Sequence, residues 1–182
     1  MSTWLKVGGA VAVGFLLLVG GALSAVYAVQ PDRFRFSRSR TIAAAPAVIR
    51  PHLVDVKSLD AWLGGFADPH DPPVVTFSAV SSGVGAWIER RDSRGSGRMT
   101  LVELTDLRVR YTNESRGAFG TGHSTLEFEL TEKAPESTEV EYVVSGDLHG
   151  VPRLLWSLVG LEKRMGPEID EKLHTLDAKC VP

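Results

Sequence analysis

The sequence predicts an α+β protein: a curved antiparallel sheet of about six to seven strands wrapped on a long C-terminal helix, preceded by one N-terminal transmembrane helix. Three observations support this. After residue 30, short segments with alternating apolar and polar residues recur between turn signals. Near the C-terminus, apolar residues recur every three or four positions, as in an amphipathic helix. At the N-terminus, residues 7–29 are almost uniformly apolar.

The apolar N-terminus is long enough for a membrane helix. At 1.5 Å per residue, residues 7–29 would cross a hydrocarbon core of ~30 Å. Lys6 before the run and the tripeptide at 26–28 also fit a cleaved signal peptide, but the run is longer than such peptides usually carry. We therefore expect residues 1–30 to be an anchor or signal peptide and residues 31–180 to be the folded domain. This predicts a single-pass membrane protein, with the side of the domain left open.

The folded part is predicted to begin with a strand over residues 33–42. Phe34 and Phe36 should face one way, and Arg33, Arg35 and the later polar residues the other, which is a period-2 strand with one buried face.

Two short helices are expected next, because Pro46 suits the first turn of a helix. They should cover residues 46–54 and 58–63, with Ser58 as the N-cap of the second. The proline- and glycine-rich residues 64–73 are then a loop.

Six further strands follow in quick succession. Each has alternating or β-branched apolar residues, and glycine or short polar turns separate them. Their order indicates an antiparallel meander with one face in water. The predicted strands are residues 74–80, 84–91, 98–104, 107–113, 124–130 and 139–145.

The last element is an amphipathic helix that begins near residue 151. Charged residues fill its other side, and Gly166-Pro167 predicts a kink because proline removes one backbone hydrogen bond. A sheet with one apolar face must bury that face against another element, and this predicted helix is the one long enough to do so. The apolar stripe comprises Leu154, Leu158, Leu161, Met165, Ile169, Leu173 and Leu176.

Composition argues against several classes of function. The net charge is −2 without a basic block, which argues against nucleic acid. The one cysteine, Cys180, cannot form an intramolecular disulfide or a cysteine metal site. Asp68, His70 and Asp71 are the densest group of potential metal ligands, but a solvated loop is the simpler interpretation. We therefore predict no metal, no cofactor and no catalytic residue, and leave enzymatic activity uncertain.

Several motifs carry a resemblance to a known superfamily. In order, these are FSRSRTIAAAP at 36–46, SGVGA at 82–86, GRMTLVE at 97–103, VRY at 109–111 and KRMGP at 163–167. Their order and spacing over residues 33–178 resemble the SRPBCC superfamily of START-like, polyketide cyclase/dehydrase-like helix-grip proteins. An apolar N-terminus looks like a membrane-anchored bacterial variant of it. One departure is that Trp62 and Phe66 stand where the family often carries a Trp-Pro-x-Trp segment.

The resemblance implies a cavity between the sheet and the C-terminal helix that binds an apolar small molecule or a lipid. The membrane, through the N-terminal helix, would be the second partner. Two alternatives stay open: a cyclase or dehydratase acting in the same cavity, and an interaction or stress-response module with a closed core. Fold alone does not choose among these functions.

Inward-facing residues of this arrangement are the candidate cavity lining. Glu103 alternates with Met99 and Leu101, so its carboxylate is expected to point inward, where burial would be costly without a partner. Its position near a strand end also fits a solvated, structural role, which is the simpler interpretation. His123 and His149 lie beside turn glycines and could stand at a cavity mouth or on the surface. The candidates are Trp62, Phe66, Phe77, Trp87, Met99, Leu101, Glu103, Tyr111, Phe128, Tyr142, Leu158, Leu161, Met165 and Ile169.

Overall fold

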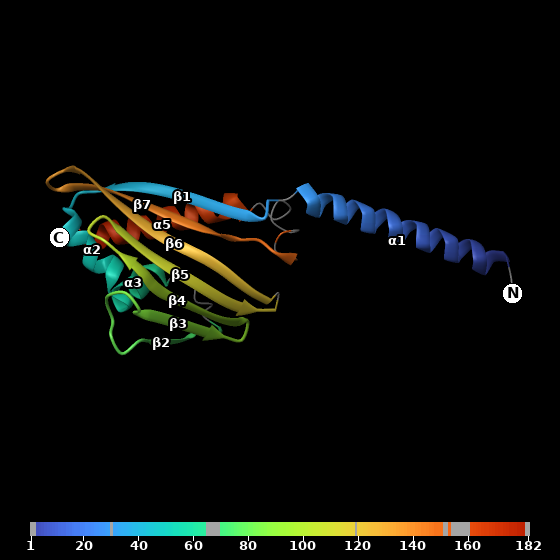
Figure 1. Ribbon diagram of the computed structural model, residues 1–182, viewed down its shortest axis with the longest axis horizontal. Helices are drawn as coiled ribbons and strands as arrows, with labels where there is room; N and C mark the ends of the chain where they lie inside the picture. Colours follow the sequence, from blue (N-terminus) through green and yellow to red (C-terminus); the bar gives the residue numbers. More distant parts are fainter. Residues whose placement is uncertain are drawn as a thin grey trace.

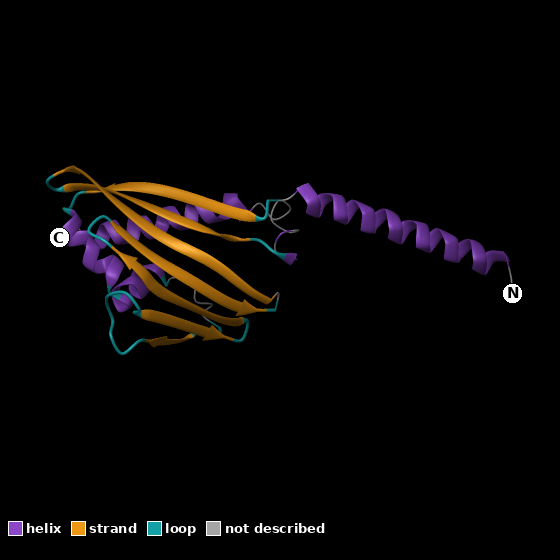
Figure 2. Ribbon diagram, in the orientation of Figure 1, coloured by secondary structure: helices purple, strands orange, loops and turns teal. Residues whose placement is uncertain are grey.

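The computed structural model describes residues 3–29, 31–64, 70–118, 120–150, 153 and 161–180. A seven-stranded sheet forms one layer and three helices form the other (Figures 1 and 2). In chain order the elements are α1 (Thr3–Val29), β1 (Arg33–Ile42), α2 (Pro46–Val54), α3 (Val56–Leu63), β2 (Val74–Phe77), β3 (Trp87–Asp92), β4 (Gly95–Leu104), β5 (Arg108–Gly117), β6 (Gly120–Ala134), β7 (Ser137–Asp147) and α5 (Leu161–Cys180).

The sheet is antiparallel throughout, with strand order β1-β7-β6-β5-β4-β3-β2. Strands β2 to β7 are a meander of hairpins, and β1 joins its far edge beside β7. The predicted α+β architecture, with a curved antiparallel sheet and a C-terminal helix, is confirmed.

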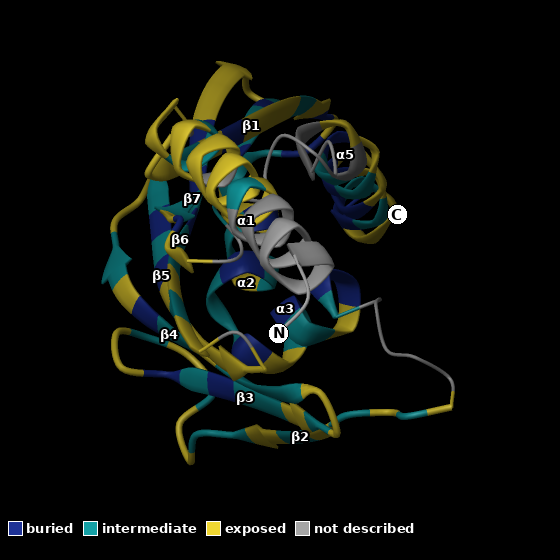
Figure 3. Cartoon of the chain, turned by 90° about the vertical axis from the view of Figure 1, so that its right-hand side faces the viewer, coloured by how far each residue is buried: buried dark blue, intermediate teal, exposed yellow. Residues whose placement is uncertain are grey.

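Helices α2, α3 and α5 cover one face of the sheet, which we call the inner face; the opposite face is the outer face. Helix α5 contacts β1, α2 and α3, while α2 contacts β6 and α3 contacts β3. Buried residues gather where the sheet and these helices face each other (Figure 3). Fully buried members of this core include Ile42, Ile49, Leu53, Leu59, Leu101, Val109, Phe128, Leu173 and Leu176.

Strand β1 differs from its predicted pattern in its second half. Because side chains alternate, Arg38 and Arg40 share the inner face with Phe36 and Ile42 rather than facing away from them. Arg40 Nε donates to Asp177 Oδ2 at 2.8 Å, and Arg38 Nε lies 3.7 Å from Asp170 Oδ2. The expectation that these arginines face outward is wrong, because carboxylates of α5 pair with them.

The junction between α2 and α3 corrects the predicted helix cap. Helix α2 spans the predicted residues, but α3 begins at Val56, and its N-cap is Asp55. Asp55 Oδ1 accepts hydrogen bonds from the backbone nitrogens of Lys57 at 3.0 Å and Ser58 at 2.8 Å. The Ser58 hydroxyl is instead 3.0 Å from His52 Nδ1.

The N-terminal segment corrects the predicted location. Over the described part of the chain, no helix is both long and apolar enough to cross a membrane. The predicted single-pass membrane localisation is therefore wrong.

Candidate functional site

Six of the predicted lining residues form the packed centre of the molecule. The Phe128 ring stacks on Tyr142 with centroids 4.7 Å apart, and it meets Trp62 edge-on at 5.7 Å. All six are at most 4% exposed. Three more of the predicted residues, Phe77, Met99 and Met165, are partly buried against this core. The six are Trp62, Leu101, Tyr111, Phe128, Tyr142 and Ile169.

The polar atoms of this centre are used within the protein. The Tyr111 hydroxyl donates to the carbonyl of Leu53 at 2.7 Å, and Trp62 Nε1 donates to the carbonyl of His52 at 3.0 Å. Burial raises the pKa of Tyr111 well above its usual value. These groups hold α2 against the sheet and α3, and that these residues line a ligand cavity remains a prediction.

Two predicted lining residues point to the outer face. Ile88 occupies the core, so its neighbour Trp87 lies on the other side of β3, where the Arg98 guanidinium sits 4.2 Å from the ring centroid. The pairing register shifts between Leu101 and Glu103, which reverses the direction expected for Glu103. Glu103 Oε2 pairs with Arg110 Nη1 at 2.6 Å. The inward orientation expected for Glu103 is therefore wrong.

The remaining predicted lining residues are not placed by the structure. Phe66 and Leu158 lie outside the described residues, as does Asp68 of the potential metal ligands. Leu161 begins α5, and its side chain is also outside them.

A cleft of about 840 Å³ lies where the inner face of the sheet ends. Figure 1 shows that this end of the sheet, with the β5–β6 hairpin and the start of β1, is the end nearer to α1. We call this cleft the end cleft. The β3–β4 turn, the β5–β6 hairpin and the adjoining ends of β1 and β7 line it. The lining residues are Phe34, Ser93, Arg94, Ser115, Arg116, Gly117, Ala118, Gly120, Thr121, Gly122, His123, Ser124, Asp147, Leu148, His149 and Gly150.

Phe34 and Leu148 give the end cleft apolar side chains. A Cβ atom on Gly146 would come within 2.8 Å of two carbon atoms of the Phe34 ring, so this glycine leaves room for the ring to lie on β7. The backbone nitrogen of Leu148 donates to the carbonyl of Asp32 at 2.8 Å, which fixes the chain after β7 beside β1.

Among the described residues of the β5–β6 hairpin, several with small side chains line the end cleft. Gly120 has φ +101, a conformation that favours glycine, and a Cβ there would meet no atom within 4 Å. Ser115 shares the inner face with Tyr111 by strand alternation and points its short side chain toward Gly122.

Charged groups stand around this apolar part. Arg116 pairs with Glu114 at 3.0 Å and Arg94 pairs with Asp92 at 3.0 Å. His123 and His149, expected either at a cavity mouth or on the surface, both line the end cleft. The end cleft therefore combines an apolar wall with a polar rim, the usual composition of a small-molecule site.

Sequence reasoning did not select Phe34, Leu148 or the hairpin as site residues. A signal for the hairpin existed in the sequence, because Gly117, Gly120 and Gly122 recur between two predicted strands, and glycine in a strand often marks a bend or a close approach of another group.

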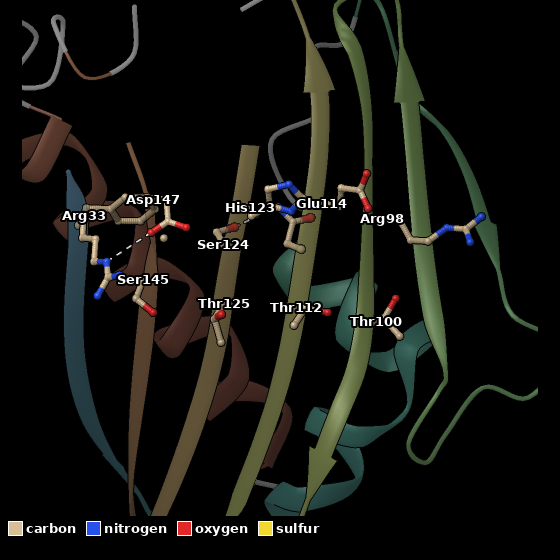
Figure 4. A pocket seen from close by; sticks show the side chains of 13 residues that line it. Arg33, Arg98, Thr100, Thr112, Glu114, His123, Ser124, Thr125, Ser145 and Asp147 are labelled. Atoms are coloured by element: carbon tan, nitrogen blue, oxygen red, sulfur yellow. Dashed lines mark hydrogen bonds and ion pairs between the residues drawn. The ribbon is translucent and has the colours of Figure 1, made fainter. Parts of the chain in front are cut away.

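A second cleft, of about 400 Å³, lies on the outer face (Figure 4). Thr100, Thr112, Thr125 and Ser145 form one row across β4, β5, β6 and β7, because each is paired with the next in the sheet register. Arg33 Nε lies 3.5 Å from Asp147 Oδ1 at one end of the row. This outer-face cleft is polar, and it lies on the opposite side of the sheet from the predicted apolar cavity.

The loop with the potential metal ligands is hydrogen-bonded to the β3–β4 turn. Asp71 Oδ2 accepts hydrogen bonds from the Ser93 hydroxyl at 2.6 Å and the Ser93 backbone nitrogen at 3.2 Å. Within the residues that the structure describes, no three His, Cys, Asp or Glu side chains are placed to hold a metal ion.

A curved antiparallel sheet that holds a long C-terminal helix on its inner face defines a helix-grip protein. The chain belongs to the family described as polyketide cyclase / dehydrase and lipid transport, whose model matches residues 33–181. The resemblance predicted from the sequence motifs is thereby confirmed at the level of the superfamily.

Solved structures share this fold at low sequence identity. A protein from Rhizobium loti is 19% identical with a TM-score of 0.55, covering 81% of this chain and 96% of its own. A Chromobacterium violaceum protein is 18% identical with a TM-score of 0.56, covering 84% and 99%. Truncated norcoclaurine synthase from Thalictrum flavum is 14% identical with a TM-score of 0.56, covering 82% and 94%. No curated protein matches the chain in sequence.

Proposed function

We propose that this protein binds an apolar small molecule in the end cleft. The observation that carries the proposal is the volume of about 840 Å³ bounded by Phe34, Leu148 and the glycine-rich hairpin. This volume falls within the range of about 300–1,000 Å³ that is usual for ligand pockets. Burying apolar ligand surface there would contribute roughly 25 cal/mol per Å².

The packing of the centre supports a binding site at this end of the inner face. Trp62, Phe128 and Tyr142 contact one another and are at most 4% exposed, so a ligand among them would have to displace packed rings. Ser115 and Gly122 project little or no side chain into the end cleft, so a ligand enters there without that cost.

The family supports a role in handling apolar molecules, since its description includes lipid transport as well as cyclase and dehydrase activity. Norcoclaurine synthase, a structural neighbour, is a synthase by its name. At 14% identity the likeness shows the fold alone, so it supports the architecture of the proposal and not a particular ligand.

The test is a fluorescence titration with N-phenyl-1-naphthylamine, a neutral apolar probe whose emission rises in apolar surroundings. Ser115→Trp should fill the end cleft and weaken probe binding by at least about tenfold, a loss of about 1.4 kcal/mol. Thr131→Trp is the matched control, because Thr131 is exposed on the outer face of β6.

Equal probe affinity in the wild type and in folded Ser115→Trp would contradict the proposal. Loss of binding in both tryptophan variants would also contradict it, since Thr131 is far from the end cleft along β6.

Catalysis in the same cleft is a second candidate, favoured by His149, which lines it, and by His123, which lines both this cleft and the outer-face cleft. Extraction and mass spectrometry of the wild type and of the His123→Ala/His149→Ala variant separate the two functions. The same bound molecule in both proteins indicates binding, and a chemically different molecule in the variant indicates catalysis.

A further inference from the structure

A third cleft, of about 400 Å³, is lined by residues of α2 and of the loops beside it. Figure 1 shows α2 at the end of the sheet that lies away from α1. We call this cleft the α2 cleft. Helix α2 forms one wall, and the loops after β2 and at the end of β4 form the other. Its lining residues are Ala47, Arg50, Pro51, Val54, Asp55, Ser82 and Leu104.

Helix α2 turns two different sides to its surroundings. Ile49 and Leu53 are fully buried against the core. Ala47, Arg50, Pro51 and Val54 recur at three- and four-residue spacing, so they form a single stripe on another side, which faces the α2 cleft. The wall is therefore apolar except for one guanidinium group.

Arg50 is a cation that the described structure does not neutralise. Its Nε atom is buried and has no hydrogen-bond partner. By contrast, Arg90 pairs with Asp60, and Arg98, Arg108 and Arg110 all pair with glutamates. A buried donor without a partner costs about 1–3 kcal/mol, which an arriving acceptor would recover.

The acid nearest in the α2 cleft is already engaged. Asp55 Oδ1 accepts from the backbone nitrogens of Lys57 and Ser58, and Oδ2 accepts from the Ser81 hydroxyl at 2.5 Å. Because both carboxylate oxygens are used to cap α3 and hold the loop after β2, Asp55 does not serve as the counter-ion of Arg50.

Two apolar side chains are exposed on the chain segments that adjoin Ser82 and Leu104. The loop that carries Ser82 exposes Val84, which is 66% exposed, and the turn after Leu104 exposes Leu107, which is 54% exposed. An occupant would therefore meet one cation that the described residues leave unpaired, the already engaged carboxylate of Asp55, and apolar side chains.

We propose that the α2 cleft binds a small organic acid with an apolar tail. A carboxylate accepts two parallel hydrogen bonds from a guanidinium, and the side-on geometry uses the Nε–H that lacks a partner here. A small shift of the Arg50 side chain would bring this donor to the carboxylate. The tail would lie against Pro51, Val54 and Leu104.

The experiment is an NMR titration of the full chain with hexanoate, following the side-chain Nε–H signal of Arg50. Acetate tests the contribution of the tail, and hexanol tests the contribution of the charge. Arg50→Gln removes the cation, and Arg35→Gln is the matched control on exposed β1. Ala47→Leu keeps the cation and fills the cleft, so it serves if Arg50→Gln folds poorly.

Hexanoate should shift the Arg50 signal saturably and bind at least about tenfold more tightly than acetate or hexanol. Arg50→Gln and Ala47→Leu should each lose at least about tenfold in affinity, and Arg35→Gln should lose none. Unchanged affinity in the first two variants, or equal affinity for hexanol, would overturn the proposal. Ser115→Trp should leave hexanoate binding intact, so failure here is distinguishable from failure at the end cleft.

Discussion

The amine of Lys172 lies on the buried side of α5, 8% exposed, where Nζ donates a hydrogen bond to the carbonyl of Leu63. Burial lowers its pKa from 10.5 to about 8, and the nearby Arg90 acts in the same direction, although Glu168 and Glu171 oppose it. Between these two pKa values, the unfolded chain keeps a proton that the folded protein releases. The free energy of unfolding should therefore rise with pH in this window.

Lys172→Met removes this linkage while keeping a side chain of similar length. The unfolding free energy of the wild type, minus that of the variant, should increase by up to about 1.4 kcal/mol per pH unit between about 8 and 10.5. Urea unfolding at pH 7, 8, 9 and 10 measures it. Parallel curves for the two proteins would contradict a lowered pKa.

Single residues also show where sequence reasoning stops. Alternation along β4 placed Met99 and Leu101 correctly on the inner side, but the register shift after Leu101 reversed Glu103. One extra residue in a strand changes the face of everything after it, and the sequence carries no clear mark of such a bulge. The sequence also did not decide which side of β3 faces inward, because Trp87 and Ile88 are both apolar and adjacent residues of a strand point to opposite faces.

At the scale of elements, Asp55 links α3 to the loop after β2 through its two carboxylate oxygens. Burial by itself would raise the pKa of Asp55, but the hydrogen bonds from Ser81, Ser58 and Lys57 outweigh it, and the pKa lies below its usual 3.8. The stability that this ionised cap contributes is present above pH 3.8 and is lost as the pH falls through the lowered pKa.

Asp55→Ala should destabilise the protein by about 1–2 kcal/mol, because α3 loses its cap and Ser81 loses its acceptor. Ser58→Ala should cost less, since Ser58 faces His52 and does not cap the helix. Thermal unfolding of both variants at neutral pH gives the comparison. A larger loss in Ser58→Ala would reverse the cap assignment.

Element order was predictable, but element length was not. Strand β5 ends at Gly117 and strand β6 begins at Gly120. Both strands therefore reach well past the residues whose apolar alternation predicted them. The polar pairs beyond, such as Glu114 with His123, give no apolar pattern, yet they remain in register because the hairpin keeps the strands together. This extension builds the end cleft, so the position of this cleft could not be predicted from the strand pattern.

At the scale of the whole molecule, the inner face has a packed centre and an open end. Aromatic rings fill the centre around Phe128, whereas glycines and short side chains leave the end beside α1 open. The fold could be predicted because apolar periodicity and motif order carry it. The volume left open could not, because it depends on how rings such as Phe34 lie on Gly146.

The most direct test of a binding site at the end of the inner face is to locate a bound apolar molecule by intermolecular nuclear Overhauser effects. With N-phenyl-1-naphthylamine bound, contacts should connect its ring protons to Phe34 and Leu148, which line the end cleft. Contacts to Leu101 and Ile169 instead would place the ligand among the packed side chains of the centre and contradict this account.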